Sequence, residues 1–229
     1  PGQGQTSRAQ KGQIDDFNTY HENILEWIKI ANEYKIPTFV LGVGLGGLII
    51  LNLLEKTELP IEGILLFSPM LELKRDYKGC KNKLISNVGK ISKDTRFKVG
   101  ITPQDLTRND EIIEETANDG LMLKKVTYSW YNLINEKMKE TMDHIRDIKP
   151  ISALIMYGTN DKILETQSIN EMKDKLKSKE MYFKVWDGLY HEIHNEPERD
   201  LVMRYVLSFL NNSVNTMGFI VNEEEIEDI

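Results

Sequence analysis

One stretch of the sequence constrains the fold more than any other. Residues 37–57 read PTFVLGVGLGGLIILNLLEKT, in which a short apolar and β-branched run lies between Pro37 and Gly42. Such a run predicts a buried parallel strand over residues 38–41. Beyond the glycines, apolar residues return at three- and four-residue steps, which predicts a helix. The four glycines between the two elements predict a sharp backbone turn from strand to helix.

This glycine frame has two functional interpretations beside that of a plain tight turn. A strand that turns directly into a helix on a G-x-x-x-G frame is typical of a nucleophile elbow, and the residue at its apex here is Gly44. An apex normally carries Ser, Cys or Asp, whereas glycine has no attacking atom. Alternatively, Gly42, Gly44 and Gly47 match the spacing of a dinucleotide-binding loop, with Glu62 about twenty residues later. Glu62 lies at the start of the next predicted strand instead of at its end, which disfavours a nucleotide site.

Composition narrows the class of protein. A chain of 229 residues, 40% hydrophobic and 28% charged, is large enough for one sizeable core. Its net charge of -7 argues against a nucleic-acid partner. No apolar run approaches the length of a membrane span. The single cysteine, Cys80, excludes an internal disulfide framework and suits a reducing compartment, so we predict a cytoplasmic location.

The rest of the chain divides by pattern into four regions. A second strand is predicted over 61–67, so that two strands joined through a helix form a parallel βαβ unit. The charged, helix-rich region that follows contains no comparable strand pattern, and we interpret it as a cap inserted over the strand ends. A separate helical domain with its own partner is the alternative. The predicted regions are core 1–70, cap 71–149, core 150–212 and an acidic tail 213–229 without chemistry.

A helix is predicted near the start of the chain. Apolar residues from Phe17 to Ala31, Trp27 among them, form one stripe at helical spacing, with Asp15 or Asp16 as the N-cap. His21 lies away from most of this stripe, so we predict a solvated side chain.

The second part of the core carries two polar side chains directly after strands. A strand predicted over 151–158 leads to Asp161, and a strand over 181–186 leads to His191, with helices over 166–177 and 197–210. Alone, Asp161 is typical of a turn and His191 of an exposed loop. Together with the elbow they stand in the order nucleophile, acid, base that α/β-hydrolases use.

Seven motifs carry a resemblance to a known family. They are PGQGQTSR at 1–8, the elbow at 42–47, FSPML at 67–71, LTRND at 106–110, SWY at 129–131, MYGTNDKI at 156–163 and YHEIHNEPER at 190–199. With them the chain resembles the lysophospholipase and monoacylglycerol lipase branch of the α/β-hydrolase superfamily, also called serine aminopeptidase S33-like. The resemblance implies an α/β-hydrolase fold, with a parallel sheet covered by helices on both faces and an inserted helical cap.

The resemblance also implies chemistry. Asp161 would be the acid and His191 the base of a Ser-Asp-His triad that hydrolyses carboxylic esters of lipid-like substrates, and the Leu45 backbone N–H would contribute to the oxyanion hole. It implies a small lipid-like ligand, no metal and no cofactor, and peripheral membrane contact through the cap. Oligomeric state stays open. The cap residues Trp130, Tyr131 and Met138 are expected either to line the cleft or to pack the cap.

The sequence departs from the family at two places. The family elbow reads Gly-His-Ser-x-Gly-Gly, whereas this chain has Val43 and Gly44 in place of the His and the nucleophilic Ser. We therefore expect impaired or absent hydrolysis, with a non-catalytic acyl-binding protein as the alternative. Ser68 is disfavoured as a substitute nucleophile because it ends a neighbouring strand before a proline. The family's oxyanion loop and first strands would lie upstream of Pro1, so we expect this chain to be the trailing part of a longer product.

Overall fold

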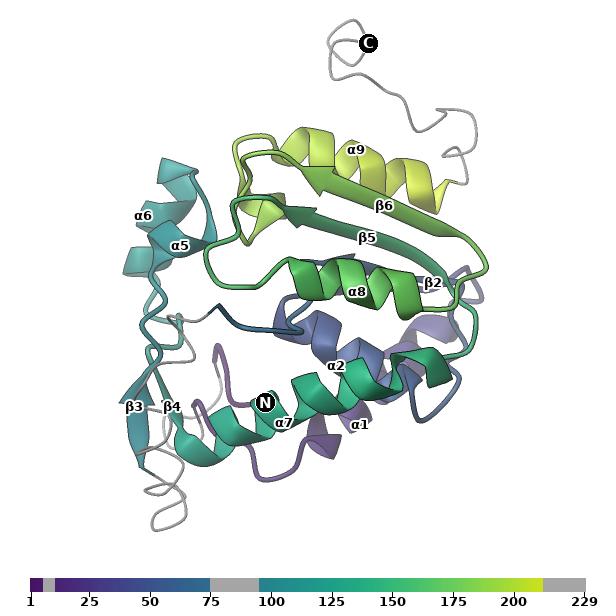
Figure 1. Ribbon diagram of the computed structural model, residues 1–229, viewed down its shortest axis with the longest axis horizontal. Coiled ribbons are helices and arrows are strands. Elements are labelled where there is room, and N and C mark those ends of the chain that lie inside the picture. The colour runs from purple at the N-terminus through teal and green to yellow at the C-terminus, as the bar shows by residue number, and fades with distance from the viewer. Residues whose placement is uncertain (6–10, 75–94, 212–229) are drawn as a thin grey trace, which may run out of the picture.

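A four-stranded parallel sheet forms the centre of the protein. The computed structural model describes residues 1–5, 11–74 and 95–211. The strands β1 (Phe39–Val43), β2 (Gly63–Phe67), β5 (Ser152–Gly158) and β6 (Met181–Trp186) are hydrogen-bonded in the order β1-β2-β5-β6. All three pairings are parallel, so the carboxyl ends of the strands meet at one edge of the sheet (Figure 1). The predicted strands are therefore present within about two residues of their expected bounds.

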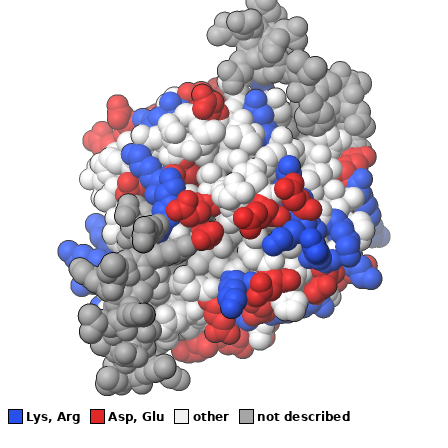
Figure 2. Space-filling view, viewed as in Figure 1, with Lys and Arg blue, Asp and Glu red and all other residues white. Residues whose placement is uncertain are grey.

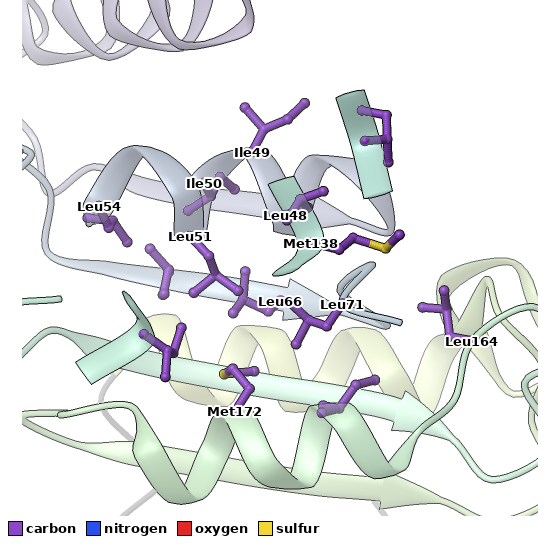
Figure 3. Packing of buried hydrophobic residues seen from close by; sticks show 14 of the residues in the cluster. Leu48, Ile49, Ile50, Leu51, Leu54, Leu66, Leu71, Met138, Leu164 and Met172 are labelled. Atoms are coloured by element: carbon purple, nitrogen blue, oxygen red, sulfur yellow. The ribbon is translucent and has the colours of Figure 1, made fainter. Parts of the chain in front are cut away.

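Helices cover the two faces of this sheet because β2 and β5 are apolar on both sides. On one face lie α2 (Leu45–Leu54), α7 (Tyr128–His144) and α8 (Gln167–Lys175), whose buried side chains belong to one hydrophobic cluster with Ile64 and Leu66 of β2. Figure 3 shows side chains of α2, with Met138 of α7 and Met172 of α8, around Leu66. The other face packs Leu65 and Phe67 against α9 (Arg199–Leu210).

The region predicted to be a cap contains a small sheet that was not predicted from the sequence. Between β2 and β5 lie β3 (Arg96–Lys98), α5 (Pro103–Leu106), α6 (Asp110–Asn118), β4 (Lys125–Thr127), α7 and the short helix η1 (Ile145–Asp147). The strands β3 and β4 pair antiparallel, whereas the sequence shows no strand pattern in this region comparable to those of the core. Each strand has three residues, which is too short for an alternating pattern to be recognised.

The first helix, α1 (Asn18–Asn32), differs from its prediction in three ways. Its N-cap residue is Phe17, although Asp16 Oδ1 accepts the Asn18 N–H at 2.9 Å. Trp27, a member of the predicted apolar stripe, is 67% exposed. His21 is 5% exposed and packs edge-on against the Phe17 ring at 5.3 Å, so the prediction of a solvated histidine is wrong. One turn of the helix separates the two rings, which buries the imidazole.

β1 has no partner on its outer side among the described residues, and Leu41 is half exposed there. The face of the molecule in Figure 2 carries acidic and basic side chains intermixed. No described helix combines the length and the apolar character needed to cross a lipid bilayer. Cys80 and the acidic tail lie outside the described residues.

Candidate active site

The turn between β1 and α2 has the geometry of an elbow with Gly44 at its apex. Gly44 has φ 51° and ψ -114°, a conformation that a side chain would strain. Its N–H donates to the Phe67 carbonyl at 3.0 Å, which fastens the turn to the end of β2. Its carbonyl accepts the N–H groups of Gly47 and Met70 at 3.0 and 2.9 Å. Backbone hydrogen bonds on both sides therefore hold the apex in place.

Close packing accounts for two of the other glycines. A Cβ on Gly42 would lie 2.6 Å from the Gly47 nitrogen, and a Cβ on Gly47 would lie 2.8 Å from Pro69 Cβ. Both glycines therefore let α2 approach β1 and β2. Glu62 lies one residue before β2, at the sheet edge opposite the Gly44 turn. The dinucleotide interpretation needs an acidic residue near the carboxyl ends of the strands, and Glu62 does not lie there.

Asp161 follows β5 and is completely buried. Its Oδ1 accepts the backbone N–H groups of Ile163 and Leu164 at 2.7 and 2.9 Å, and its Oδ2 contacts His191 Nδ1 at 2.8 Å. Burial by itself would raise the pKa of Asp161, but the His191 hydrogen bond and charge, together with the two N–H donors, outweigh it and lower that pKa. The carboxylate is therefore ionised at neutral pH.

His191 lies in the loop after β6 and is 6% exposed. Because the ionised Asp161 accepts a hydrogen bond from Nδ1, the neutral ring carries its proton there and Nε2 presents a lone pair. A Cβ on Gly44 would lie 3.1 Å from this Nε2. The structure therefore brings together Gly44, Asp161 and His191, the three positions selected from the sequence.

Leu45, the predicted oxyanion residue, is the first residue of α2. Its N–H has no hydrogen-bond partner among the described residues, as is usual in the first turn of a helix. Ser68 is 0% exposed at φ 43° and does not line the cavity beside Gly44. Ser68 Oγ is therefore not placed to attack a ligand there.

A buried carboxylate that the sequence analysis did not single out fixes the loop that carries His191. Glu196 is 0% exposed, and its Oε1 accepts the N–H groups of Tyr190 and Arg108 at 3.0 and 3.2 Å. The Arg108 Nε donates to the second oxygen at 2.7 Å. The Glu192 N–H also donates to the Leu106 carbonyl at 2.8 Å. The cap segment 106–108 therefore holds the His191 loop. Both segments belong to motifs quoted above, but nothing in the sequence shows that they touch.

A cavity of about 630 Å³ opens above the elbow. Gly44, Leu45 and His191 line it, together with residues of α1 and of β1, the strand that has no outer partner among the described residues. Of the three cap residues considered from the sequence, Trp130 lines the cavity, and its Nε1 donates to the Tyr20 hydroxyl at 3.1 Å. Met138 packs in the core, and Tyr131 packs on the ring of Phe97.

The cavity is predominantly apolar, and Glu192 is the one acidic side chain that lines it, while no described Lys or Arg does. Among the described residues, no group of three or more His, Cys, Asp or Glu side chains is arranged to hold a metal ion. The arrangement can position an apolar chain with a carbonyl near Gly44 and can accept a proton at His191 Nε2.

Comparison with known proteins gives consistent matches. The family described as serine aminopeptidase, S33 matches residues 1–198. The chain is 30% identical over 215 residues to phospholipase YtpA of Bacillus subtilis, covering 93% of this chain and 83% of YtpA. It is 22% identical over 202 residues to monoglyceride lipase of Homo sapiens, covering 85% of this chain and 65% of that protein.

Solved structures agree with these matches. The monoacylglycerol lipase of Paleococcus ferrophilus superposes with a TM-score of 0.80 at 22% identity, covering 92% of this chain and 80% of that one. A soluble variant of monoglyceride lipase from Saccharomyces cerevisiae, in complex with a substrate analog, gives 0.81 at 19% identity, covering 92% and 74%. These likenesses confirm the α/β-hydrolase fold predicted from the sequence.

Proposed function

The chain belongs to the serine aminopeptidase S33 family of α/β-hydrolases, and on that premise we propose that its cavity binds a lipid-like carboxylic ester with the carbonyl above Gly44. The glycine then prevents formation of an acyl-enzyme, so that hydrolysis is impaired or absent. The observation that carries this proposal is the approach of His191 Nε2 to within 3.1 Å of the Cβ position of Gly44. The phospholipase and monoglyceride lipase relatives support the class of ligand.

The expected defect follows from the reaction that such a site performs. A serine at the apex would give its proton to His191 Nε2 and attack the carbonyl, while Asp161 stabilises the imidazolium that forms. The Leu45 N–H would bind the developing oxyanion. With Gly44 there is no oxygen to attack, and loss of the nucleophile in a serine protease costs on the order of a million-fold in kcat, roughly 8 kcal/mol. Only water activated by His191 could then attack the ester.

A non-catalytic acyl-binding protein is the second candidate. It is favoured by the apolar cavity, which needs no nucleophile to bind an acyl chain. Turnover of a p-nitrophenyl ester distinguishes the two candidates. If the unchanged protein exceeds the buffer rate and His191→Ala does not, the result supports water activation. If the unchanged protein only equals the buffer rate, the result supports binding alone.

Gly44→Ser tests whether the remaining machinery is intact. We expect this variant to hydrolyse a p-nitrophenyl ester faster than the unchanged protein, on the order of a hundredfold or more. A Cβ at 3.1 Å from Nε2 requires His191 to shift by a few tenths of an ångström. Gly44→Ala is the matched control, because it adds the same Cβ and the same backbone strain without a hydroxyl, and it should show no gain.

The second control is Gly44→Ser combined with His191→Ala, which should return turnover to the starting value. A folded Gly44→Ser protein that gains nothing over Gly44→Ala would contradict the proposal. The peripheral membrane contact through the cap and the cytoplasmic location remain predictions from the sequence.

A further inference from the structure

Glu192 places one fixed negative charge in the cavity. It follows His191 in the chain and lines the cavity together with His191 and Gly44. Its backbone N–H donates to the Leu106 carbonyl at 2.8 Å, and Leu106 lines the cavity as well. Its Oε2 accepts a hydrogen bond from Asn195 Nδ2 at 2.7 Å. Main-chain and side-chain contacts therefore both hold this carboxylate at the cavity wall.

Neighbouring cationic side chains do not neutralise this charge. Among the described residues, no Lys or Arg forms an ion pair with Glu192. Arg108 is bound to two other glutamates, and Lys162 Nζ donates to the Gln104 carbonyl at 3.1 Å. Burial lowers the pKa of His194, so this ring is uncharged at neutral pH. The carboxylate therefore acts on a ligand without a compensating charge from these groups.

The surroundings strengthen the effect of this charge. The other residues that line the cavity are predominantly apolar, and no described Lys or Arg is among them. Two charges attract or repel one another more strongly beside apolar walls than in bulk water, because the effective dielectric constant is lower. A cleft lined by charge of one sign also concentrates ligands of the opposite sign. The cavity should therefore attract a cationic group and repel a phosphate, sulfate or carboxylate.

The geometry of the site decides which part of an ester meets Glu192. With the ester carbonyl above Gly44, the base of such a site gives its proton to the leaving alcohol oxygen, which therefore lies on the side of His191. Glu192 is the next residue in the chain and lines the same cavity. The acyl chain is uncharged and suits the apolar lining. Selection by charge therefore acts on the alcohol part of the ester.

We propose that Glu192 selects the alcohol part of the ester by its charge. An alcohol part with an ammonium group binds more tightly than a neutral one, and a neutral one binds more tightly than one with an anionic group. This inference rests on the proposed ester-binding function and adds to it the class of alcohol. Glu192 acts as a specificity residue and takes no part in the reaction itself.

Three octanoate esters of similar size test the proposal, each kept below its micelle concentration. They are octanoylcholine, which carries a quaternary ammonium group, neohexyl octanoate, in which carbon replaces the charged nitrogen, and sulfoethyl octanoate, which carries an anionic group. Trp27 and Trp130 line the cavity, so tryptophan fluorescence follows binding. We expect the unchanged protein to bind the choline ester about fivefold more tightly than the neohexyl ester, and the neohexyl ester about fivefold more tightly than the sulfoethyl ester.

Glu192→Gln removes the charge but keeps the size of the side chain and an oxygen that accepts the Asn195 hydrogen bond. Both affinity ratios should fall below about twofold in this variant, while the affinity for the neohexyl ester stays within about twofold of its starting value. Glu171→Gln is the matched control, because it changes the net charge equally at an exposed position on α8. It should keep both ratios.

Equal affinities for the three esters in the unchanged protein, ratios that survive Glu192→Gln, or ratios that are lost in Glu171→Gln would each overturn the proposal. Binding of the neohexyl ester without any preference by charge would overturn this inference and leave the proposed function standing. Absence of binding by all three esters would overturn both. Failure of the proposed function is therefore distinguishable from failure of the selection by charge.

Discussion

Acidification should destabilise the protein through His21. Burial, followed by the charges of Lys56 and Lys137, lowers the pKa of His21 from 6.5 to about 4, against the opposing charges of Asp16 and Glu140. Its Nε2 is buried without a partner among the described residues. The folded state therefore binds fewer protons than the unfolded state between these two pKa values, and stability is lost as the pH falls from about 6.5 towards 4.

The magnitude follows from the two pKa values. Between about pH 7.5 and pH 5.0, His21 should lower the free energy of unfolding by roughly 2 kcal/mol. Urea denaturation of the unchanged protein and of His21→Gln at both pH values measures this quantity. We expect the free energy of unfolding to fall by about 2 kcal/mol less in His21→Gln than in the unchanged protein between these two pH values. A cost of the substitution that is the same at both pH values does not affect this difference.

Two other groups titrate nearby and serve as checks. Burial raises the pKa of Glu55, which contributes with the opposite sign but equally in both proteins, so the comparison subtracts it. A hydrogen bond to Asp147 raises the pKa of the exposed His144. His144→Gln should therefore still lose free energy of unfolding when the pH falls. If the unchanged protein and His21→Gln lose the same free energy on acidification, the reasoning about the buried imidazole is refuted.

The elbow and the cap clamp give two further predictions. Gly42→Ala should cost about 3 kcal/mol, because its Cβ would lie 2.6 Å from the Gly47 nitrogen, whereas Gly46→Ala has no atom within 4 Å and should be neutral or slightly stabilising. Equal denaturation midpoints for these two alanine variants would contradict the packing account. Arg108→Gln leaves the buried Glu196 without its guanidinium and should cost about 1–3 kcal/mol, whereas Glu198→Gln breaks only an exposed pair and should cost less than about 1 kcal/mol. In the Gly44→Ser background, Arg108→Gln should lower kcat more than it raises KM. An unchanged kcat would show that the contact between Arg108 and Glu196 does not position His191.

Much of the core was predictable because its signals are local. The apolar run before Gly42 and the helical spacing after Gly47 identify β1 and α2 directly. Asp161 and His191 follow strands whose parallel pairing brings their carboxyl ends to one edge. Once the sheet is parallel, chain order alone is enough to place both side chains near the elbow.

The features that were missed depend on contacts between distant residues. The Arg108–Glu196 pair joins residues 88 positions apart, and no periodicity in the sequence predicts this contact. The β3–β4 pair joins three-residue strands across the cap. His21 was assigned to the solvated side of α1 from spacing, but its neighbour Phe17 turns inward and buries it. Tertiary packing overrides such helical patterns.

The central claim is that an intact Asp161–His191 pair faces a turn that lacks an attacking atom. Covalent labelling with a fluorophosphonate, followed by peptide mass spectrometry, tests it most directly, because this reagent requires a nucleophile activated by a base. The account predicts modification at position 44 in Gly44→Ser, and none in the unchanged protein or in Gly44→Ser combined with His191→Ala. A folded Gly44→Ser protein that stays unlabelled, or one that is labelled equally without His191, would contradict it.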